Sequence, residues 1–107
     1  IEVRAIGDIA STGTIASRGT ALIDAGGALR NAGGVVIADV LDVRAAEVAN
    51  NSGVIEQLGA AAGRIAATGA IDNRAGRIAG IGAGALAVTA GTTLDNTAGG
   101  LVGANGA

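Results

Sequence analysis

The chain has 107 residues, of which half are apolar and 20 are glycine, and it contains no aromatic residue, cysteine, histidine or proline. The net charge is only −2 and the seven basic residues, all arginine, are scattered singly, which argues against a nucleic acid held by charge. The missing cysteine and histidine exclude thiol catalysis, Ser-His-Asp triads and most zinc sites. The many Ile, Leu and Val residues exclude a disordered segment.

Two features bear on where the chain acts. It begins at Ile1 without an initiator Met or a signal peptide, so we expect it to be a segment cut from a longer protein. Its longest strongly apolar uncharged run, Ile78 to Leu94, has 17 residues and contains four glycines. A membrane-spanning helix needs roughly 20 apolar residues, so we expect no stable membrane insertion.

Five related units follow one another along the chain. They begin near residues 9, 29, 48, 71 and 94, at spacings of 20, 19, 23 and 23 residues. The last four share the pattern apolar-x-Asn-x-x-Gly-x-apolar, as in residues 71–78. The first unit has Ser11 in place of Asn and is one residue short before its glycine. This repeat covers nearly the whole chain and predicts a solenoid.

The units consist of short runs in which aliphatic residues alternate with Asp, Thr or small residues. Examples are residues 21–24, 35–38, 41–43 and 86–90. Such alternation predicts short half-buried strands, and the glycines between them predict corners. We therefore predict an all-β fold, a single-stranded parallel β-helix of about five coils of 19–23 residues. The longer spacings after residues 55 and 78 predict extra residues that bulge outward at a corner.

Two columns of equivalent residues should run along this solenoid. In-register stacking places equivalent side chains roughly 4.8 Å apart, within reach of amide-to-amide hydrogen bonds. We predict that the repeated asparagines form a structural ladder rather than a ligand site; they are Asn31, Asn50, Asn73 and Asn96. We predict a second column of corner glycines, where positive φ costs little; they are Gly34, Gly53, Gly76 and Gly99.

Asp72 and Asp95 are the best candidates for chemistry because they occupy equivalent places in adjacent units. A stacked carboxylate pair could share a calcium ion or act as an acid and base. The alternative, which we favour, is that both face solvent while Arg74 and Arg77 offset their repulsion. We expect no catalytic residue, no metal and no cofactor. A polysaccharide-binding or polysaccharide-cleaving β-helix remains the alternative function, although the chain lacks aromatic platforms for sugars.

The units Ile71–Ile78 and Leu86–Gly91, followed by Leu94–Asn96, resemble the haemagglutinin repeats of filamentous haemagglutinin and related two-partner secretion exoproteins of Gram-negative bacteria. The resemblance is close over residues 65–107 and looser before residue 29. It implies a right-handed β-helix shaft, exported through an outer-membrane transporter and displayed or released at the cell surface. The departures are Ser11 in place of Asn, and Arg30 and Ala49 where Asp is usual, which affect the register of the first coil.

Taken with this resemblance, the sequence predicts a non-enzymatic rod segment of a secreted bacterial adhesin involved in virulence. Such a rod would hold adhesive or toxic regions away from the cell. Its expected partners are neighbouring repeats of the same chain and the transporter during export. Host-cell receptors or sulfated glycans are a further expectation, with Arg74 and Arg77 as the candidate surface contacts.

Overall fold

The computed structural model describes residues 2–97 and 99–104. The described residues contain strands, turns and loops and no helix. The strands, in chain order, are β1 (Glu2–Ala5), β2 (Ile9–Ala10), β3 (Thr14–Ala25), β4 (Ala28–Arg30), β5 (Val35–Ala45), β6 (Glu47–Ala49), β7 (Val54–Gln57), β8 (Gly63–Ala67), β9 (Ile71–Asp72), β10 (Arg77–Gly80), β11 (Leu86–Ala90), β12 (Leu94–Asp95) and β13 (Leu101–Ala104).

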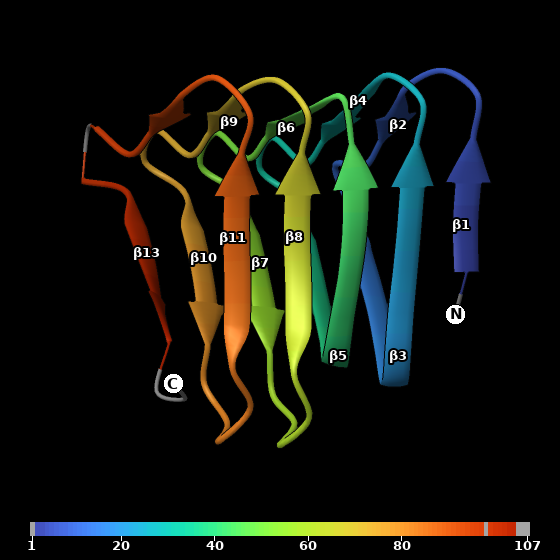
Figure 1. Cartoon of the computed structure of the whole chain (residues 1–107), viewed down its shortest axis with the longest axis vertical. Helices are drawn as coiled ribbons and strands as arrows, with labels where there is room; N and C mark the ends of the chain where they lie inside the picture. Colours follow the sequence, from blue (N-terminus) through green and yellow to red (C-terminus); the bar gives the residue numbers. More distant parts are fainter. Residues whose placement is uncertain (1, 98, 105–107) are drawn as a thin grey trace.

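All strand pairs are parallel, and the chain winds through two sheets, as the prediction of stacked coils requires (Figure 1). Five short strands, β2, β4, β6, β9 and β12, form the upper sheet of Figure 1. The other eight strands form a larger folded sheet with two arms. The front arm of Figure 1 contains β1, β8, β11 and the second halves of β3 and β5. The back arm contains β7, β10, β13 and the first halves of β3 and β5.

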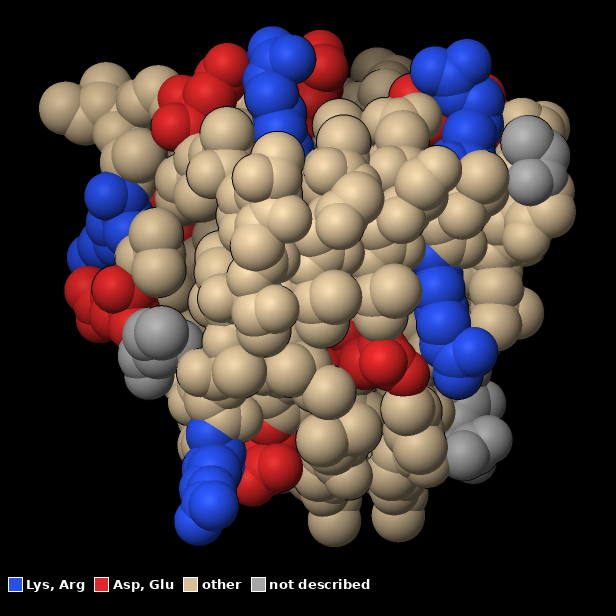
Figure 2. Space-filling model, turned by 180° about the vertical axis from the view of Figure 1, so that it is seen from behind, with Lys and Arg blue, Asp and Glu red and all other residues tan. Residues whose placement is uncertain are grey.

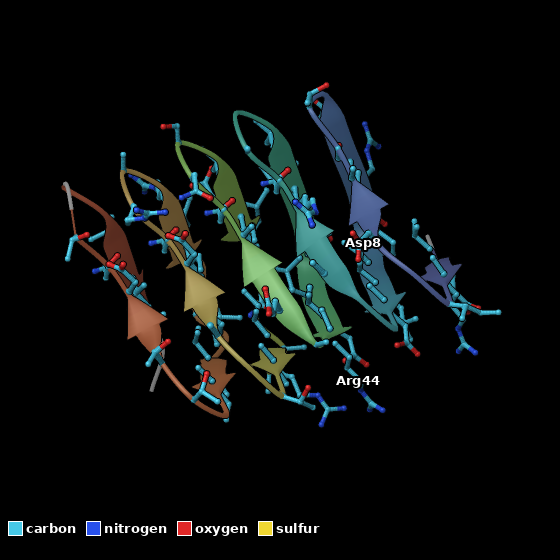
Figure 3. All side chains as sticks on the ribbon, turned by 90° about the horizontal axis from the view of Figure 1, so that it is seen from above. Asp8 and Arg44 are labelled. Carbon is cyan, nitrogen blue, oxygen red and sulfur yellow. The ribbon has the colours of Figure 1, made fainter. Side chains whose placement is uncertain are left out.

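Equivalent residues of successive coils lie in register. In the upper sheet Ile9 pairs with Leu29, Leu29 with Val48, Val48 with Ile71, and Ile71 with Leu94. These are the residues near which the sequence placed the start of each coil. Seen from above, the coils therefore form a row of stacked parallel turns (Figure 3). The fold is thus a parallel β-solenoid of about five turns.

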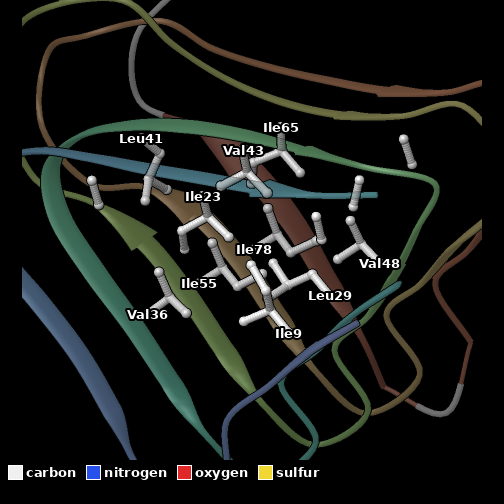
Figure 4. Close-up of a cluster of buried hydrophobic side chains, with 14 of the residues drawn as sticks. Ile9, Ile23, Leu29, Val36, Leu41, Val43, Val48, Ile55, Ile65 and Ile78 are labelled. Atoms are coloured by element: carbon white, nitrogen blue, oxygen red, sulfur yellow. The ribbon is translucent and has the colours of Figure 1, made fainter. Parts of the chain in front are cut away.

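The core is a column of aliphatic side chains between the two sheets (Figure 4). Most strands turn alternate residues inward: β5 buries Val36 and Ala38 in its first half, and Leu41, Val43 and Ala45 in its second. The largest fully buried aliphatic side chains come from both arms and the upper sheet; they are Ile23, Leu29, Val36, Leu41, Val43, Val48, Ile55, Ile65, Ile71 and Ile78. With no aromatic residue in the chain, these branched side chains and smaller buried alanines fill most of the interior.

The coils differ in length mainly at the corner between the back and front arms, where the longer coils have three extra residues. A fourth extra residue lies between the front arm and the upper sheet. In the first two coils β3 and β5 pass through this corner without ending, and β3 has a bulge between Ser17 and Thr20. In the next two coils the strands stop and residues 58–62 and 81–85 form loops. Both loops project beyond the sheets at the bottom of Figure 1. The outward bulge expected from the longer spacing is therefore present in both coils.

Candidate functional site

The repeated asparagines form a hydrogen-bonded ladder along the corner between the upper sheet and the back arm. The Nδ2 of Asn31 donates to the Oδ1 of Asn50 at 2.8 Å. Asn50 donates to Asn73 in the same way at 2.8 Å, and Asn73 donates to Asn96 at 2.8 Å. The first three asparagines are fully buried, whereas Asn96 is exposed. The three buried amides therefore hydrogen-bond along the column and are not open to a ligand.

Each ladder amide also closes its own turn. The Nδ2 of Asn50 donates to the backbone oxygen of Gly53 at 3.2 Å and to that of Arg77 in the following coil at 3.1 Å. Asn31 and Asn73 repeat both contacts. In the described structure the ladder has one unsatisfied buried atom, the Oδ1 of Asn31. The preceding coil has Ser11 at this position, so no amide there continues the ladder.

Gly34, Gly53 and Gly76 form the predicted column, but none of them has the positive φ that was expected; close approach of the preceding coil requires glycine there, and the last coil differs. A Cβ added at Gly53 would collide with the backbone oxygen of Asn31, and one at Gly76 would collide with that of Asn50. Gly34 has the same environment relative to Ser11. The fourth member is Gly100, whose added Cβ would collide with the backbone oxygen of Asn73. Placing Gly99 in this column was therefore wrong, because the last turn has one more residue between its Asn and its glycine.

Gly99 belongs to the neighbouring column of residues with positive φ. Its φ is 81°, and the equivalent Gly33, one residue before Gly34, has φ of 70°. Ser52 and Ala75 occupy the same place in the middle coils, each with φ of 55°. A non-glycine residue rarely adopts this conformation. Stacking of the turns above and below therefore holds Ser52 and Ala75 in a strained backbone.

Asp72 and Asp95 lie directly opposite each other in the pairing of β9 with β12. The Oδ1 of Asp72 accepts hydrogen bonds from the backbone N–H of Arg74 at 3.2 Å and from its Nε at 3.0 Å. The Oδ1 of Asp95 accepts from the N–H of Thr97 at 3.1 Å and from its Oγ1 at 2.8 Å. Each carboxylate thus caps its own turn, and the described residues contain no group of three or more metal-ligating side chains.

Electrostatics at Asp72 agrees with this capping role. The hydrogen bond from the Arg74 guanidinium is the largest cause that lowers the pKa of Asp72, from 3.8 to about 2. Hydrogen bonds from the Asn51 side chain and the Arg74 backbone also lower it, while partial burial opposes them. A carboxyl with so low a pKa is ionised at neutral pH and is a poor proton donor. Asp72 therefore lacks the raised pKa that a general acid needs.

Arg74 and Arg77 lie on the surface, but each is paired with a carboxylate. Arg74 lies 2.9 Å from Asp72 and 3.9 Å from Asp95, so it does offset the repulsion between these aspartates. Arg77 pairs with Glu56 at 3.4 Å instead. Both side chains are about half exposed, at 55% and 48%. They can meet a ligand only in competition with their present partners.

Four of the other five arginines are paired as well, whereas Arg18 has no ion pair among the described residues. Arg30 lies 3.3 Å from Asp8, whose Oδ1 also accepts the Ala28 N–H at 2.8 Å (Figure 3). The Ala28 hydrogen bond and Arg30 lower the pKa of Asp8. Arg44 and Arg64 share Asp42 in the front arm, at 3.7 and 3.4 Å. Most charges therefore pair along or between coils. The back arm presents a broad uncharged surface, interrupted by few charged side chains (Figure 2).

Gln57 is a buried polar residue that the repeat pattern did not reveal. It is fully buried, and its amide makes three hydrogen bonds, to Leu41, Ala61 and Ala85. The equivalent residues of the neighbouring coils are Ala38 and Gly80. Because the amide occurs in one coil only, it forms no column, and a search for repeated residues passes over it.

The fold and these contacts define the class of the protein as a parallel β-solenoid repeat segment. Among the residues that the structure describes, no helix is long and apolar enough to cross a membrane. No protein-family model, curated protein or solved structure matches the chain.

Proposed function

We propose that the chain is a structural shaft segment of a secreted bacterial surface adhesin. The observation that carries the proposal is the uninterrupted stacking of coils, in which strand pairing, the aliphatic core and the asparagine ladder all run along one axis. Each coil contacts mainly its neighbours, so a solenoid can be lengthened by adding coils without redesigning its core. The adhesin and export parts of the proposal rest on the resemblance to haemagglutinin repeats.

The lateral surface supports a spacer better than it supports a sugar-cleaving site. Asp72 and Asp95 hold turns in place, and Asp42 is shared by two arginines. Cleavage of a glycosidic bond needs one carboxyl with a raised pKa, whereas the pKa of Asp72 is lowered. The chain also lacks aromatic side chains on which sugar rings stack.

Duplication of one internal coil tests the shaft directly. Residues 48–70 form one 23-residue period, because Val48 and Ile71 are paired in register. Inserting a second copy of 48–70 before Ile71 should lengthen the rod by roughly 4.8 Å and leave its cross-section unchanged. Small-angle X-ray scattering on variants with one, two and three duplications would measure this increment. Growth in all dimensions at once would overturn the shaft.

Surface charge reversal separates a spacer from an adhesive surface. If the segment is a spacer, Arg74→Glu and Arg77→Glu in the surface-displayed protein should leave attachment to host cells and to immobilised heparin unchanged. Thr89→Glu, on an exposed position of the front arm, is a matched control. Loss of attachment in the arginine variants alone, with unchanged circular dichroism, would assign adhesion to this surface and overturn the spacer role.

A further inference from the structure

Gln57 lies where a short coil meets a long one. In β5 the two arms form one continuous strand, whereas the next coil ends β7 at Gln57 and resumes with β8 after the loop 58–62. Pairing of β5 with β8 begins only at Asp42 and Arg64. Leu41, the residue before Asp42, therefore has no paired residue in the next coil, where the loop 58–62 lies outside the sheet. Leu41 is fully buried, so its N–H needs a partner other than water.

The side chain of Gln57 supplies that partner and two further contacts. Its Oε1 accepts the hydrogen bond of the Leu41 N–H at 3.0 Å. Its Nε2 donates to the backbone oxygen of Ala61 at 3.1 Å and to that of Ala85 at 3.3 Å. Leu41, Ala61 and Ala85 belong to three successive coils. A carboxamide suits this place because it offers an acceptor and two donors on one short planar group.

The residues packed around Gln57 leave space for its amide. A Cβ added at Gly63 would collide with the Oε1 of Gln57. The next coil does not need a second amide, because the two loops bond to each other. The N–H of Ile81 donates to the backbone oxygen of Gln57 at 2.8 Å, and the N–H of Gly84 donates to that of Gly59 at 3.1 Å. Gly80, the equivalent of Gln57, accordingly has no side chain.

We propose that Gln57 stabilises the junction between the last short coil and the first long coil. Its amide replaces the backbone partner of Leu41 that the first loop removes, and it fixes both loops to the core. The need for the amide arises at the change of coil length and not in every long coil. This role concerns how the solenoid is built and stands whether or not the solenoid serves as an adhesin shaft.

Amide hydrogen exchange tests the contact to Leu41. In Gln57→Leu the exchange rate of the Leu41 amide should rise at least tenfold relative to that of Val43, two residues further along β5. The ratio of the two rates removes any general loss of stability. Glu56→Leu, whose side chain is at the adjacent, less buried position of β7, should leave the ratio unchanged. An unchanged ratio in Gln57→Leu would overturn the proposal.

Gln57→Glu gives a second readout if the leucine variant does not fold. A buried glutamate has a raised pKa, and only its protonated form can both accept from Leu41 and donate to a loop carbonyl. The unfolding temperature of Gln57→Glu should therefore rise as the pH falls from 7 to 4, whereas that of the parent chain should not. Parallel pH profiles for the two chains would show that the donor contacts of residue 57 are unimportant, and the proposal would fail.

Discussion

The first two coils and the next two have the same core but different corners. Ile23 in β3 and Ile65 in β8 occupy one inward column, joined through Val43, and all three are fully buried. Between the arms, however, the early coils bend a continuous strand, while the later ones insert the loops 58–62 and 81–85. The inward columns therefore stay constant from coil to coil, whereas the corner between the arms varies most in length.

Truncation of the core should affect both coil types equally. We expect Ile23→Ala and Ile65→Ala each to lower the free energy of unfolding by about 3 kcal/mol, because both remove fully buried aliphatic volume. Urea denaturation measures each loss. If the two losses differ by more than about 1 kcal/mol, the cores of the short and long coils are not equivalent.

The asparagine ladder runs from the short coils into the long ones. Replacing Asn50, in its middle, should destabilise the fold more than replacing Asn31, at its start. Asn50→Ala removes the acceptor of Asn31 and the donor to Asn73. It should cost about 2–3 kcal/mol because buried partners lose hydrogen bonds. Asn31→Ala should cost less, since the Oδ1 of Asn31 has no partner to lose. Equal losses in thermal unfolding would show that the amides act independently rather than as a ladder.

The glycine column should tolerate alanine in the first coil but not in the coils that follow. Gly53→Ala should cost about 1–3 kcal/mol, because its Cβ would press on the Asn31 backbone and force the coils apart. Gly13 lies in the same column, yet a Cβ there meets nothing within 4 Å. Gly13→Ala should therefore change stability by less than about 0.5 kcal/mol. A comparable loss at Gly13 in chemical denaturation would contradict the placement of the first turn.

Acid sensitivity is the smallest expected effect and belongs to the later coils. The pKa of Asp72 is lowered in the folded chain to about 2, so its ion pair stabilises the fold at neutral pH. That contribution is lost as the pH falls from about 5 towards 2, because the unfolded chain binds the proton first. For a surface pair we expect a loss of about 1 kcal/mol or less. Asp72→Asn should flatten this part of the profile in acid titrations followed by circular dichroism; an unaltered slope would refute it.

The sequence was most informative where a residue recurs in every coil. The register of the upper sheet and the alignment of Asn31, Asn50, Asn73 and Asn96 could be predicted because in-register stacking turns a sequence repeat into a spatial column. Gly99 was misassigned because equal Asn-to-Gly spacing was assumed, whereas the last turn has an extra residue and places Gly100 against Asn73.

Features that occur once could not be predicted in this way. Gln57 is the amide of one coil only, and only the path of the neighbouring coils shows which backbone groups it satisfies. The partner of Arg77 was also not predicted, because Arg77 and Glu56 are far apart in sequence yet lie on adjacent strands. Arg74, in contrast, lies beside Asp72 and Asp95 as expected. The continuous strands β3 and β5 were expected to break at the corner between the arms, but the backbone there bends without leaving the sheet.

The variable corner has a consequence for mutational tolerance. A one-residue insertion or deletion within a strand of the upper sheet turns the following residues of that strand to the opposite face, so it is damaging there. At the corner between the arms, three extra residues are absorbed by a projecting loop and the inward columns resume at Ile65 and Val88. Foreign peptides grafted between Leu58 and Gly63, or between Ile81 and Leu86, would thus be displayed on adjacent coils at a spacing of roughly 4.8 Å. The solenoid is a ready-made scaffold for such arrays.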